Sequence, residues 1–327
     1  MHTERLTRVD DAVRILRAGG LVAVPSETVY GLAARGLHEE HVRAIFGAKG
    51  RPVDNPVILH VLGLDDAWPL WSVDDGARAR VELLAGAFWP GPLTLVAPRS
   101  ALVNDVVTAG LDRVAVRAPS HPLFRAVIAG VGEPIAAPSA NASSRPSPTS
   151  ADDVLASLDG AIDAVLEGGP CAVGIESTVV DVSGPRVRLL RPGAVSAASM
   201  RALGLDVEDG PLARDNAAAS PGLRHRHYAP RGFTLTLVDD SELARAWDDS
   251  AAVLVRASTQ ARLGARAGLT FALPDDAAGY ARELYAALYR LERAAGDDDV
   301  TRCLLERVPE QPVWDAVRDR LRRAAGA

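Results

Sequence analysis

The sequence contains almost no lysine. Of its 36 lysine and arginine residues, 35 are arginine, and the single lysine is Lys49. Such a bias usually reflects genome composition. It nevertheless singles out Lys49, because an ammonium is a compact point charge with three donors that a planar guanidinium does not replace in every geometry.

The chain is also poor in the features that mark secreted, membrane and zinc-binding proteins. Its 327 residues include two cysteines, Cys171 and Cys303, which form neither a disulfide framework nor a zinc pattern. No apolar run approaches the roughly 18 residues of a membrane span. The N-terminus lacks the apolar core of a secretory signal. A reducing cytoplasm is therefore the expected compartment, with no membrane contact.

An excess of positive charge is absent as well. The formal net charge is −6 at pH 7, and aromatic residues make up 5% of the chain. Proteins that bind nucleic acids generally carry a basic face, often with aromatic residues on which bases stack. The composition thus argues against a general nucleic-acid binder and leaves only a local basic cleft open.

The common nucleotide-binding and hydrolase motifs are missing. The sequence has no G-x-x-x-x-G-K-[ST] loop and no G-x-G-x-x-G after a predicted strand. It also lacks the G-x-S-x-G nucleophile turn and the H-E-x-x-H metal motif. A nucleotide would therefore have to be bound by another arrangement.

Hydrophobic periodicity predicts an α/β protein with two domains. Residues 1–203 mix strands with helices, which favours a twisted sheet with both parallel and antiparallel pairs, including a hairpin over 177–190. The periodicity fails over residues 204–232, which we interpret as a linker or functional loop. Residues 233–327 alternate strands with helices, which predicts a smaller, parallel, Rossmann-like domain.

Polar side chains gather where predicted strands of the first domain end. Ser26, Glu27 and Thr28 follow a buried strand, although a simple capped turn explains them equally well. Lys49 and Arg51 lie in a turn that two prolines stiffen, which suits an anion site or, alternatively, a solvated basic turn.

Two charged or titratable side chains are predicted within apolar strands. A histidine in such a strand, like His60, is more often a core residue with its hydrogen bonds made inside the protein than a ligand. A guanidinium such as that of Arg117 is costly to bury unless it meets an anion, and a structural carboxylate is as good a partner as a ligand.

Hydroxyl and amide groups are dense in residues 137–149, which include Ser139, Asn141 and Thr149. Ligands of open sheets bind in the crevice outside the strand ends, so we interpret these segments as one site. It offers cations for phosphates and no nucleophile–base pair. This combination favours phosphoryl or nucleotidyl transfer, where positioning and charge neutralisation do the catalysis.

Five ordered motifs carry a resemblance to a known family. They are Pro-Ser-Glu-Thr-Val-Tyr-Gly from residue 25, Lys-Gly-Arg-Pro…Asn-Pro from 49, Ala-Pro-Ser-Ala-Asn…Pro-Ser-Pro-Thr from 137, Glu-Ser-Thr-Val-Val-Asp from 176 and Leu-Arg-Pro-Gly from 190. The chain resembles the YrdC-like threonylcarbamoyl-AMP synthases. Its linker, Ser-Pro-Gly…His-Tyr-Ala-Pro, and its second domain resemble the longer, two-domain members, so the resemblance covers the whole chain.

The resemblance implies an activity and its reactants. Members of this family make threonylcarbamoyl-AMP and pyrophosphate from L-threonine, bicarbonate and ATP, with Mg²⁺. Downstream partner proteins then transfer the threonylcarbamoyl group to an adenosine beside the anticodon of certain tRNAs. By the same resemblance, the first domain has a basic concave face.

The resemblance also implies site residues. Those expected around threonine are Thr28, His60, Arg117, Ser139 and Ser177. Those expected to contact ATP are Arg51, Asn55, Asn141, Thr149 and Arg191, with Lys49 near the phosphates. Lys49 and Arg51 would act in catalysis by neutralising phosphate charge, and Tyr228 of the linker would close over the nucleotide as part of a lid.

Two other hypotheses compete with this one. An RNA-binding module, or a direct tRNA contact, would suit a basic concave face, but the net negative charge counts against it. A metal site at His225 and His227 is the second, although no cysteine or carboxylate cluster lies near them in the sequence. No protein-held metal is therefore expected.

Overall fold

We analysed a computed structural model that describes residues 2–208, 228–246, 251–264, 269–294 and 300–326. The chain divides into two compact units. The first comprises residues 1–143, 148–172 and 176–224, and the second comprises residues 144–147, 173–175 and 225–327. Two short stretches of the N-terminal part are thus grouped with the C-terminal unit.

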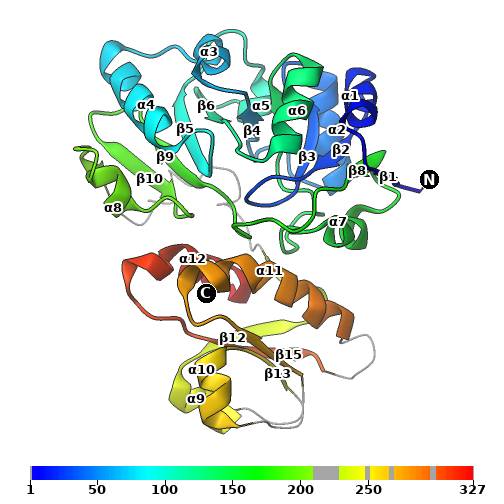
Figure 1. Cartoon of the computed structure of the whole chain (residues 1–327), viewed down its shortest axis with the longest axis vertical. Coiled ribbons are helices and arrows are strands. Elements are labelled where there is room, and N and C mark those ends of the chain that lie inside the picture. The colour runs from blue at the N-terminus through cyan, green and yellow to red at the C-terminus, as the bar shows by residue number, and fades with distance from the viewer. Residues whose placement is uncertain (1, 209–227, 247–250, 265–268, 295–299, 327) are drawn as a thin grey trace. The chain divides into compact units, whose positions relative to one another are not determined.

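The first unit is built on one large mixed sheet, seen in the upper part of Figure 1. In the described residues its strand order is β1-β8-β2-β3-β7-β4-β6-β5-β9-β10-β11. The strands are β1 (Glu4–Leu6), β2 (Val22–Val24), β3 (Gly31–Arg35), β4 (Ile58–His60), β5 (Leu93–Pro98), β6 (Arg113–Arg117), β7 (Ile135–Ala136), β8 (Ala164–Leu166), β9 (Thr178–Asp181), β10 (Val187–Arg191) and β11 (Val207–Glu208).

Helices pack around this sheet. They are α1 (Val9–Arg17), α2 (Glu39–Lys49), α3 (Leu64–Ala67), the 3₁₀ helix η1 (Trp68–Leu70), α4 (Asp75–Phe88), α5 (Asp105–Thr108), α6 (Pro122–Val131), α7 (Ala151–Leu158) and α8 (Ala197–Arg201). Figure 1 shows α1 and α6 side by side, and the two helices pack directly on each other.

Both faces of the sheet are buried at its central strands, where successive side chains point alternately into two apolar cores. Ala23 belongs to the larger apolar core, whereas Val22 and Val24 belong to a second core together with Phe124 of α6. Side chains of a strand point alternately to opposite faces, so a strand covered on both faces is apolar throughout. This explains why β2 has no polar residue.

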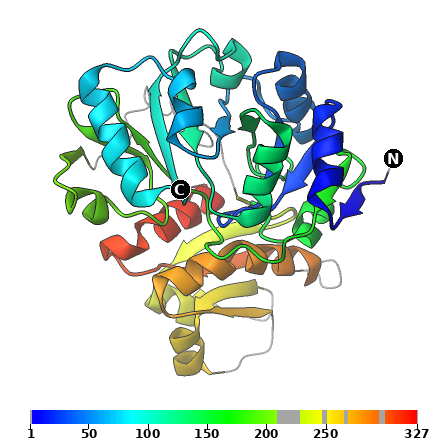
Figure 2. The ribbon, with the colours of Figure 1, turned by 45° about the horizontal axis from the view of Figure 1, so that its top comes forward.

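The second unit contains a smaller sheet in which every pairing is parallel. Its described strands have the order β12-β15-β13-β14. Figures 1 and 2 show α11 and α12 on one face of this sheet and α9 and α10 on the other. The elements are β12 (Thr234–Val238), α9 (Asp240–Ala246), β13 (Ala251–Arg256), α10 (Ala257–Leu263), β14 (Thr270–Leu273), α11 (Ala277–Ala294), β15 (Arg302–Glu306), η3 (Pro312–Trp314) and α12 (Asp315–Ala325).

The predicted fold class is confirmed, with a mixed sheet first and a parallel, doubly wound sheet after it. The hairpin between β9 and β10 is antiparallel, as expected. Strand β11 lies within the predicted linker and extends the first sheet. Because residues 209–227 are outside the described part, the linker boundaries 204–232 stay a prediction.

Candidate active site

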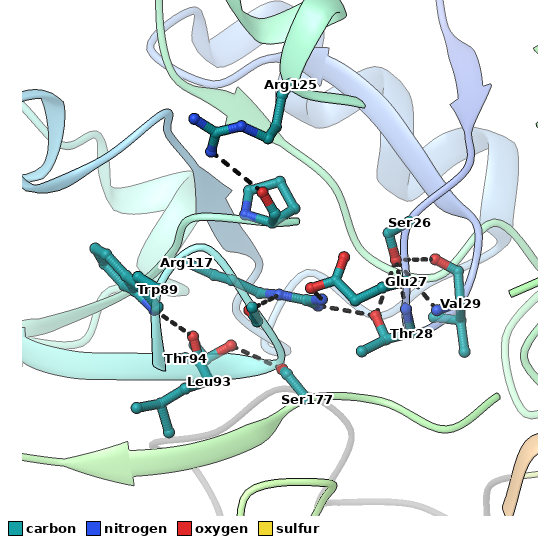
Figure 3. A network of polar contacts seen from close by, with 12 residues as sticks. Ser26, Glu27, Thr28, Val29, Trp89, Leu93, Thr94, Arg117, Arg125 and Ser177 are labelled. Carbon is teal, nitrogen blue, oxygen red and sulfur yellow. Dashed lines mark hydrogen bonds and ion pairs between the residues drawn. The ribbon is translucent and has the colours of Figure 1, made fainter. Parts of the chain in front are cut away.

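The turn between β2 and β3 carries the first group of polar residues. The two strands are antiparallel, with Val24 opposite Gly31, so the residues between them must reverse direction. The Ser26 hydroxyl holds this turn: it accepts from the backbone N–H of Thr28 at 3.1 Å and of Val29 at 3.2 Å. It also lies 2.9 Å from the Thr28 hydroxyl. The hydroxyl and carboxylate side chains of the turn are therefore fixed in place (Figure 3).

Arg117, the last residue of β6, reaches this turn. Its guanidinium donates to Glu27 Oε1 at 2.6 Å, to Thr28 Oγ1 at 2.9 Å and to the Gly91 carbonyl at 3.2 Å. Figure 3 shows the guanidinium directed at Glu27 and Thr28. Three of the five N–H groups of the side chain thus have a partner among the described residues, and two remain for another acceptor.

The sequence left open whether Arg117 pairs with a structural carboxylate, and in this structure it does. Burial alone would raise the pKa of Glu27, but the charge of Arg117 and its hydrogen bond outweigh burial and hold that pKa below its usual value. The pair is therefore ionised at neutral pH. Both side chains are at most one-tenth exposed, so removing either one would leave a buried charge without its partner.

His60 lies beside Arg117, because β4 and β6 are parallel neighbours with these two residues in register. Its ring packs on Phe124 with centroids 5.0 Å apart, and its Nδ1 atom is buried with no hydrogen-bond partner among the described residues. Burial, and then the charge of Arg117, lower the pKa of His60 to about 3. At neutral pH His60 is therefore an uncharged wall of the site.

Lys49, the last residue of α2, is almost completely buried. Its Nζ atom donates to the carbonyl of Ser139 at 2.5 Å, to the carbonyl of Asn141, and weakly to Asn141 Oδ1 at 3.5 Å. No carboxylate pairs with it among the described residues. Burial, and secondly the charge of Arg51, lower the pKa of Lys49 well below its usual value. An anion near Lys49 would oppose both effects and raise this pKa again.

A second hydroxyl group of the site precedes β9. Ser177 Oγ is hydrogen-bonded to Thr94 Oγ1 of β5 at 2.7 Å and accepts from Arg191 Nη2 at 3.1 Å. Arg191 Nε also donates to the Ser177 carbonyl at 3.1 Å. All three side chains are buried. The parallel pairing of β5 with β9 places Thr94 and Ser177 side by side at the start of both strands.

The remaining predicted ATP contacts lie in two loops. Arg51 donates to the carbonyls of Asn55 at 3.3 Å and Pro56 at 2.8 Å, so it stiffens its own turn. Thr149 is buried and donates through its hydroxyl to Asp153 at 3.2 Å. The loop containing Asn141 is joined to the β2–β3 turn by a hydrogen bond from Ala140 N to Tyr30 O of 2.8 Å.

Two predictions fall elsewhere. Tyr228 belongs to the second unit, where its ring centroid lies 5.3 Å from that of Tyr285 and Arg320 stands over its ring. Its contact with ATP stays a prediction. His225 and His227 lie outside the described residues, so the structure does not test that metal hypothesis.

The first unit therefore brings Thr28, His60 and Arg117 together, and links Lys49 to Ser139 and Asn141. The sequence analysis missed Thr94 as a partner of Ser177. The available signal was that Thr94 is the one polar residue in the apolar strand β5. In the described part of the chain, the one His, Cys, Asp or Glu cluster close enough to share an ion lies away from these residues, at the start of α2.

Comparison with known proteins gave consistent similarities. A family profile described as telomere recombination matches residues 14–193, and a profile described as threonylcarbamoyl-AMP synthase, C-terminal domain, matches residues 194–326. A curated protein of Pyrococcus abyssi named threonylcarbamoyl-AMP synthase is 37% identical, over 96% of this chain and 93% of its own. A curated protein of Bacillus subtilis with the same name is 34% identical, over 98% of this chain and 93% of its own.

Solved structures agree with these similarities. The crystal structure of P. abyssi Sua5 complexed with L-threonine superposes with a TM-score of 0.86 and 35% sequence identity, covering 99% of this chain and 97% of that one. The structure of E. coli YciO is 19% identical with a TM-score of 0.52, over 61% of this chain, and shares only the fold of that part.

Proposed function

The chain belongs to the family of threonylcarbamoyl-AMP synthases, and on that premise we propose that the polar groups around Arg117, Lys49 and Ser177 form its active site. The chain is a nucleotidyltransferase. We propose that it converts L-threonine, bicarbonate and ATP to L-threonylcarbamoyladenylate and pyrophosphate. One observation carries the proposal: buried cations, hydroxyl groups and a neutral imidazole lie at the ends of strands and of helix α2 around one sheet, and the described residues there include no nucleophile–base pair.

Threonine is proposed to bind between the β2–β3 turn and the end of β6. Its carboxylate suits the two N–H groups of Arg117 that have no acceptor among the described residues. The hydroxyls of Thr28 and Ser177 and the backbone near Ser139 supply hydrogen bonds to the small polar side chain. The solved P. abyssi relative, which holds L-threonine, supports threonine as a substrate.

ATP is proposed to lie along the loops that contain Asn55, Asn141 and Thr149, with its phosphates near Lys49, Arg51 and Arg191. A buried ammonium without a carboxylate partner is electrostatically unfavourable until an anion arrives. The polyphosphate would supply that anion. Lys49 also donates to the Ser139 and Asn141 carbonyls, so it ties the nucleotide loop to the threonine side of the site.

Magnesium is proposed to enter as its ATP complex. The predicted phosphate-binding residues are cations, amides and hydroxyls, and this donor set fits an ion held mainly by phosphate oxygens and water rather than by a protein cage. When bound, Mg²⁺ would offset negative charge on the phosphates.

The chemistry needs positioning more than a protein nucleophile. The threonine amine and bicarbonate give a carbamate and water. A carbamate oxygen then attacks the α-phosphorus, forming a P–O bond as the bond to pyrophosphate breaks. Free carbamate loses CO₂ readily, so exclusion of water helps. We propose that the linker around Tyr228 closes the site as a lid.

The surroundings of the reaction are also proposals. Among the described helices, none is both long and apolar enough to cross a membrane. Both cysteines are free and buried, which is compatible with a reducing cytoplasm. The product would be handed to proteins that transfer the threonylcarbamoyl group to tRNA.

The test is release of pyrophosphate from ATP by the purified full chain. We expect release only when L-threonine and bicarbonate are both present, together with Mg²⁺. Release that does not depend on threonine would contradict the proposal. The matched substrate control is D-threonine, which carries the same groups but cannot place its carboxylate, amine and hydroxyl on the same partners.

A further inference from the structure

A cluster of metal-ligand side chains lies at the start of α2, in residues that the reaction does not use. Glu40 Oε1 is 3.8 Å from His38 Nδ1 and 3.8 Å from His41 Nε2. One donor atom from each of the three side chains lies within 4.8 Å of the others. The two imidazole rings are stacked with centroids 5.1 Å apart, so both rings face the same side of the helix end.

A second observation concerns the far nitrogen of His38. His38 Nε2 lies 3.4 Å from Glu133 Oε2, and Glu133 in turn accepts from Arg35 Nε at 2.6 Å. A carboxylate on the outer nitrogen is the arrangement that orients histidine ligands of metals, because it fixes the proton on that nitrogen and leaves the other lone pair bare. At 3.4 Å the Glu133 carboxylate is an ion-pair neighbour of His38 Nε2, and the other ring nitrogen, Nδ1, faces Glu40.

The ring of His41 packs closely against Gly19, because a Cβ atom at residue 19 would come within 2.6 Å of His41 Nε2; the observed position of this ring therefore requires glycine there. Ligands of a tetrahedral ion at about 2.0–2.2 Å lie roughly 3.3–3.5 Å from one another. The two distances of 3.8 Å and the overall spread of up to 4.8 Å require an inward movement, which the mostly exposed Glu40 and the half-buried His38 side chains must share.

We propose that His38, Glu40 and His41 bind a divalent transition-metal ion such as Zn²⁺, with at least one open coordination position. Two imidazoles and one carboxylate suit Zn²⁺, Co²⁺ or Ni²⁺, whereas Mg²⁺ prefers an all-oxygen octahedron. The site is therefore distinct from the Mg²⁺ that accompanies ATP. The open position would hold water or a donor from another molecule.

The experiment is titration of the full, metal-free chain with Co²⁺, followed by its visible absorption, and with Zn²⁺ by calorimetry. The chain has seven histidines, so rival ligands must be controlled. We compare the wild type with His38→Gln, with His41→Gln, with a His225→Gln/His227→Gln double variant and with His2→Gln. The His2 side chain is 85% exposed and serves as the surface control.

We expect one equivalent of Co²⁺ to bind with a tetrahedral or five-coordinate spectrum that excess Mg²⁺ does not abolish. His38→Gln and His41→Gln should each weaken binding at least tenfold, and the two histidine controls should leave it unchanged. Glu133→Gln should weaken binding less than either histidine substitution, because it removes the carboxylate beside His38 and the ion-pair partner of Arg35 but no ligand. Zn²⁺ should raise the Tm of the wild type but not of His41→Gln, while pyrophosphate release stays the same in both.

Three outcomes would overturn the proposal. The first is the absence of a saturable Co²⁺ spectrum in the wild type. The second is binding that survives in both His38→Gln and His41→Gln. The third is binding that disappears in the His225→Gln/His227→Gln variant, which would assign the ion to the other histidine pair. Each variant is checked by near-ultraviolet circular dichroism, so loss of folding is distinguished from loss of a ligand.

Discussion

Replacing Lys49 by arginine tests whether the site requires an ammonium. The substitution keeps the charge and changes only its shape. The Lys49 side chain ends among three oxygens, of which the Ser139 carbonyl is at 2.5 Å and Asn141 Oδ1 at 3.5 Å. The donors of an ammonium diverge from one atom, whereas those of a guanidinium are spread over a plane. Lys49→Arg therefore cannot reproduce the three contacts.

The magnitude follows from the burial of the residue. Lys49 is 3% exposed, so the larger head must displace its neighbours, which typically costs about 1–3 kcal/mol of unfolding free energy. An orphaned carbonyl would add about 1–3 kcal/mol. Displacement of the Ser139–Asn141 segment by about 1 Å would misplace substrate and reduce turnover about 100-fold. We thus expect a folded but weakened protein with a large loss in kcat.

The assay combines urea unfolding with steady-state pyrophosphate release at saturating threonine, bicarbonate and ATP. The matched control is Arg43→Lys, because Arg43 is exposed, lies on the same helix and has Glu39 as its ion-pair partner in the described part of the chain. The control should behave like the wild type in both measurements. If Lys49→Arg is folded and its kcat/KM stays within twofold of the wild type, the reasoning about ammonium geometry is refuted.

Three further predictions concern the threonine side of the site. Arg117→Ala should raise the KM for threonine and lower the free energy of unfolding by about 3–5 kcal/mol, because it leaves Glu27 buried and unpaired. Adding Glu27→Gln should restore much of the stability but not the KM. If the double variant recovered both, Arg117 would not be part of the threonine pocket. His60 has a usual pKa of 6.5 and a folded pKa of about 3, so between these values the unfolded state binds the extra proton and the folded state loses stability as pH falls. Compared with His60→Gln, the wild type should therefore lose about 1.4 kcal/mol more per pH unit below 6.5 in urea unfolding, and parallel pH profiles would contradict a buried neutral imidazole. A pocket that hydrogen-bonds the substrate hydroxyl should accept serine poorly, with a loss of roughly 1–3 kcal/mol for the methyl group, and should reject valine more strongly; equal kcat/KM for valine and threonine would exclude hydroxyl recognition.

Much of the fold was predictable because hydrophobic periodicity and turn residues agree in most segments. The hairpin predicted over residues 177–190 is present as the antiparallel pair of β9 and β10. Strand β3 was not predicted, since Gly31-Leu-Ala-Ala-Arg35 consists mainly of residues with low strand propensity. The strand forms because β2 and β7 pair with it on both sides, a tertiary constraint that a local pattern does not contain.

The sequence marked the segments from which we build the candidate site, but not the pairing between their side chains. Proline, hydroxyl and charged residues at strand ends marked the segments. The sequence could not decide whether Arg117 meets Glu27 or a ligand, because that depends on the turn geometry that Ser26 fixes. It also gave no reason to connect Thr94 with Ser177, which are 83 residues apart. Such contacts arise from strand order, which periodicity does not reveal.

The two buried cations of the candidate site, Arg117 and Lys49, differ in whether a carboxylate neutralises them. Arg117 is already neutralised by Glu27, so a threonine carboxylate bound there, as proposed, would gain only the N–H groups that have no acceptor among the described residues. Its recognition would then rest on geometry more than on charge. Among the described residues, the hydrogen bonds of Lys49 go to carbonyl and amide oxygens, and burial disfavours its charged form. A polyphosphate would therefore gain more from Lys49 than a carboxylate would from Arg117. In the proposed arrangement, electrostatic stabilisation by the protein would be concentrated on the nucleotide side, where negative charge is redistributed as pyrophosphate leaves.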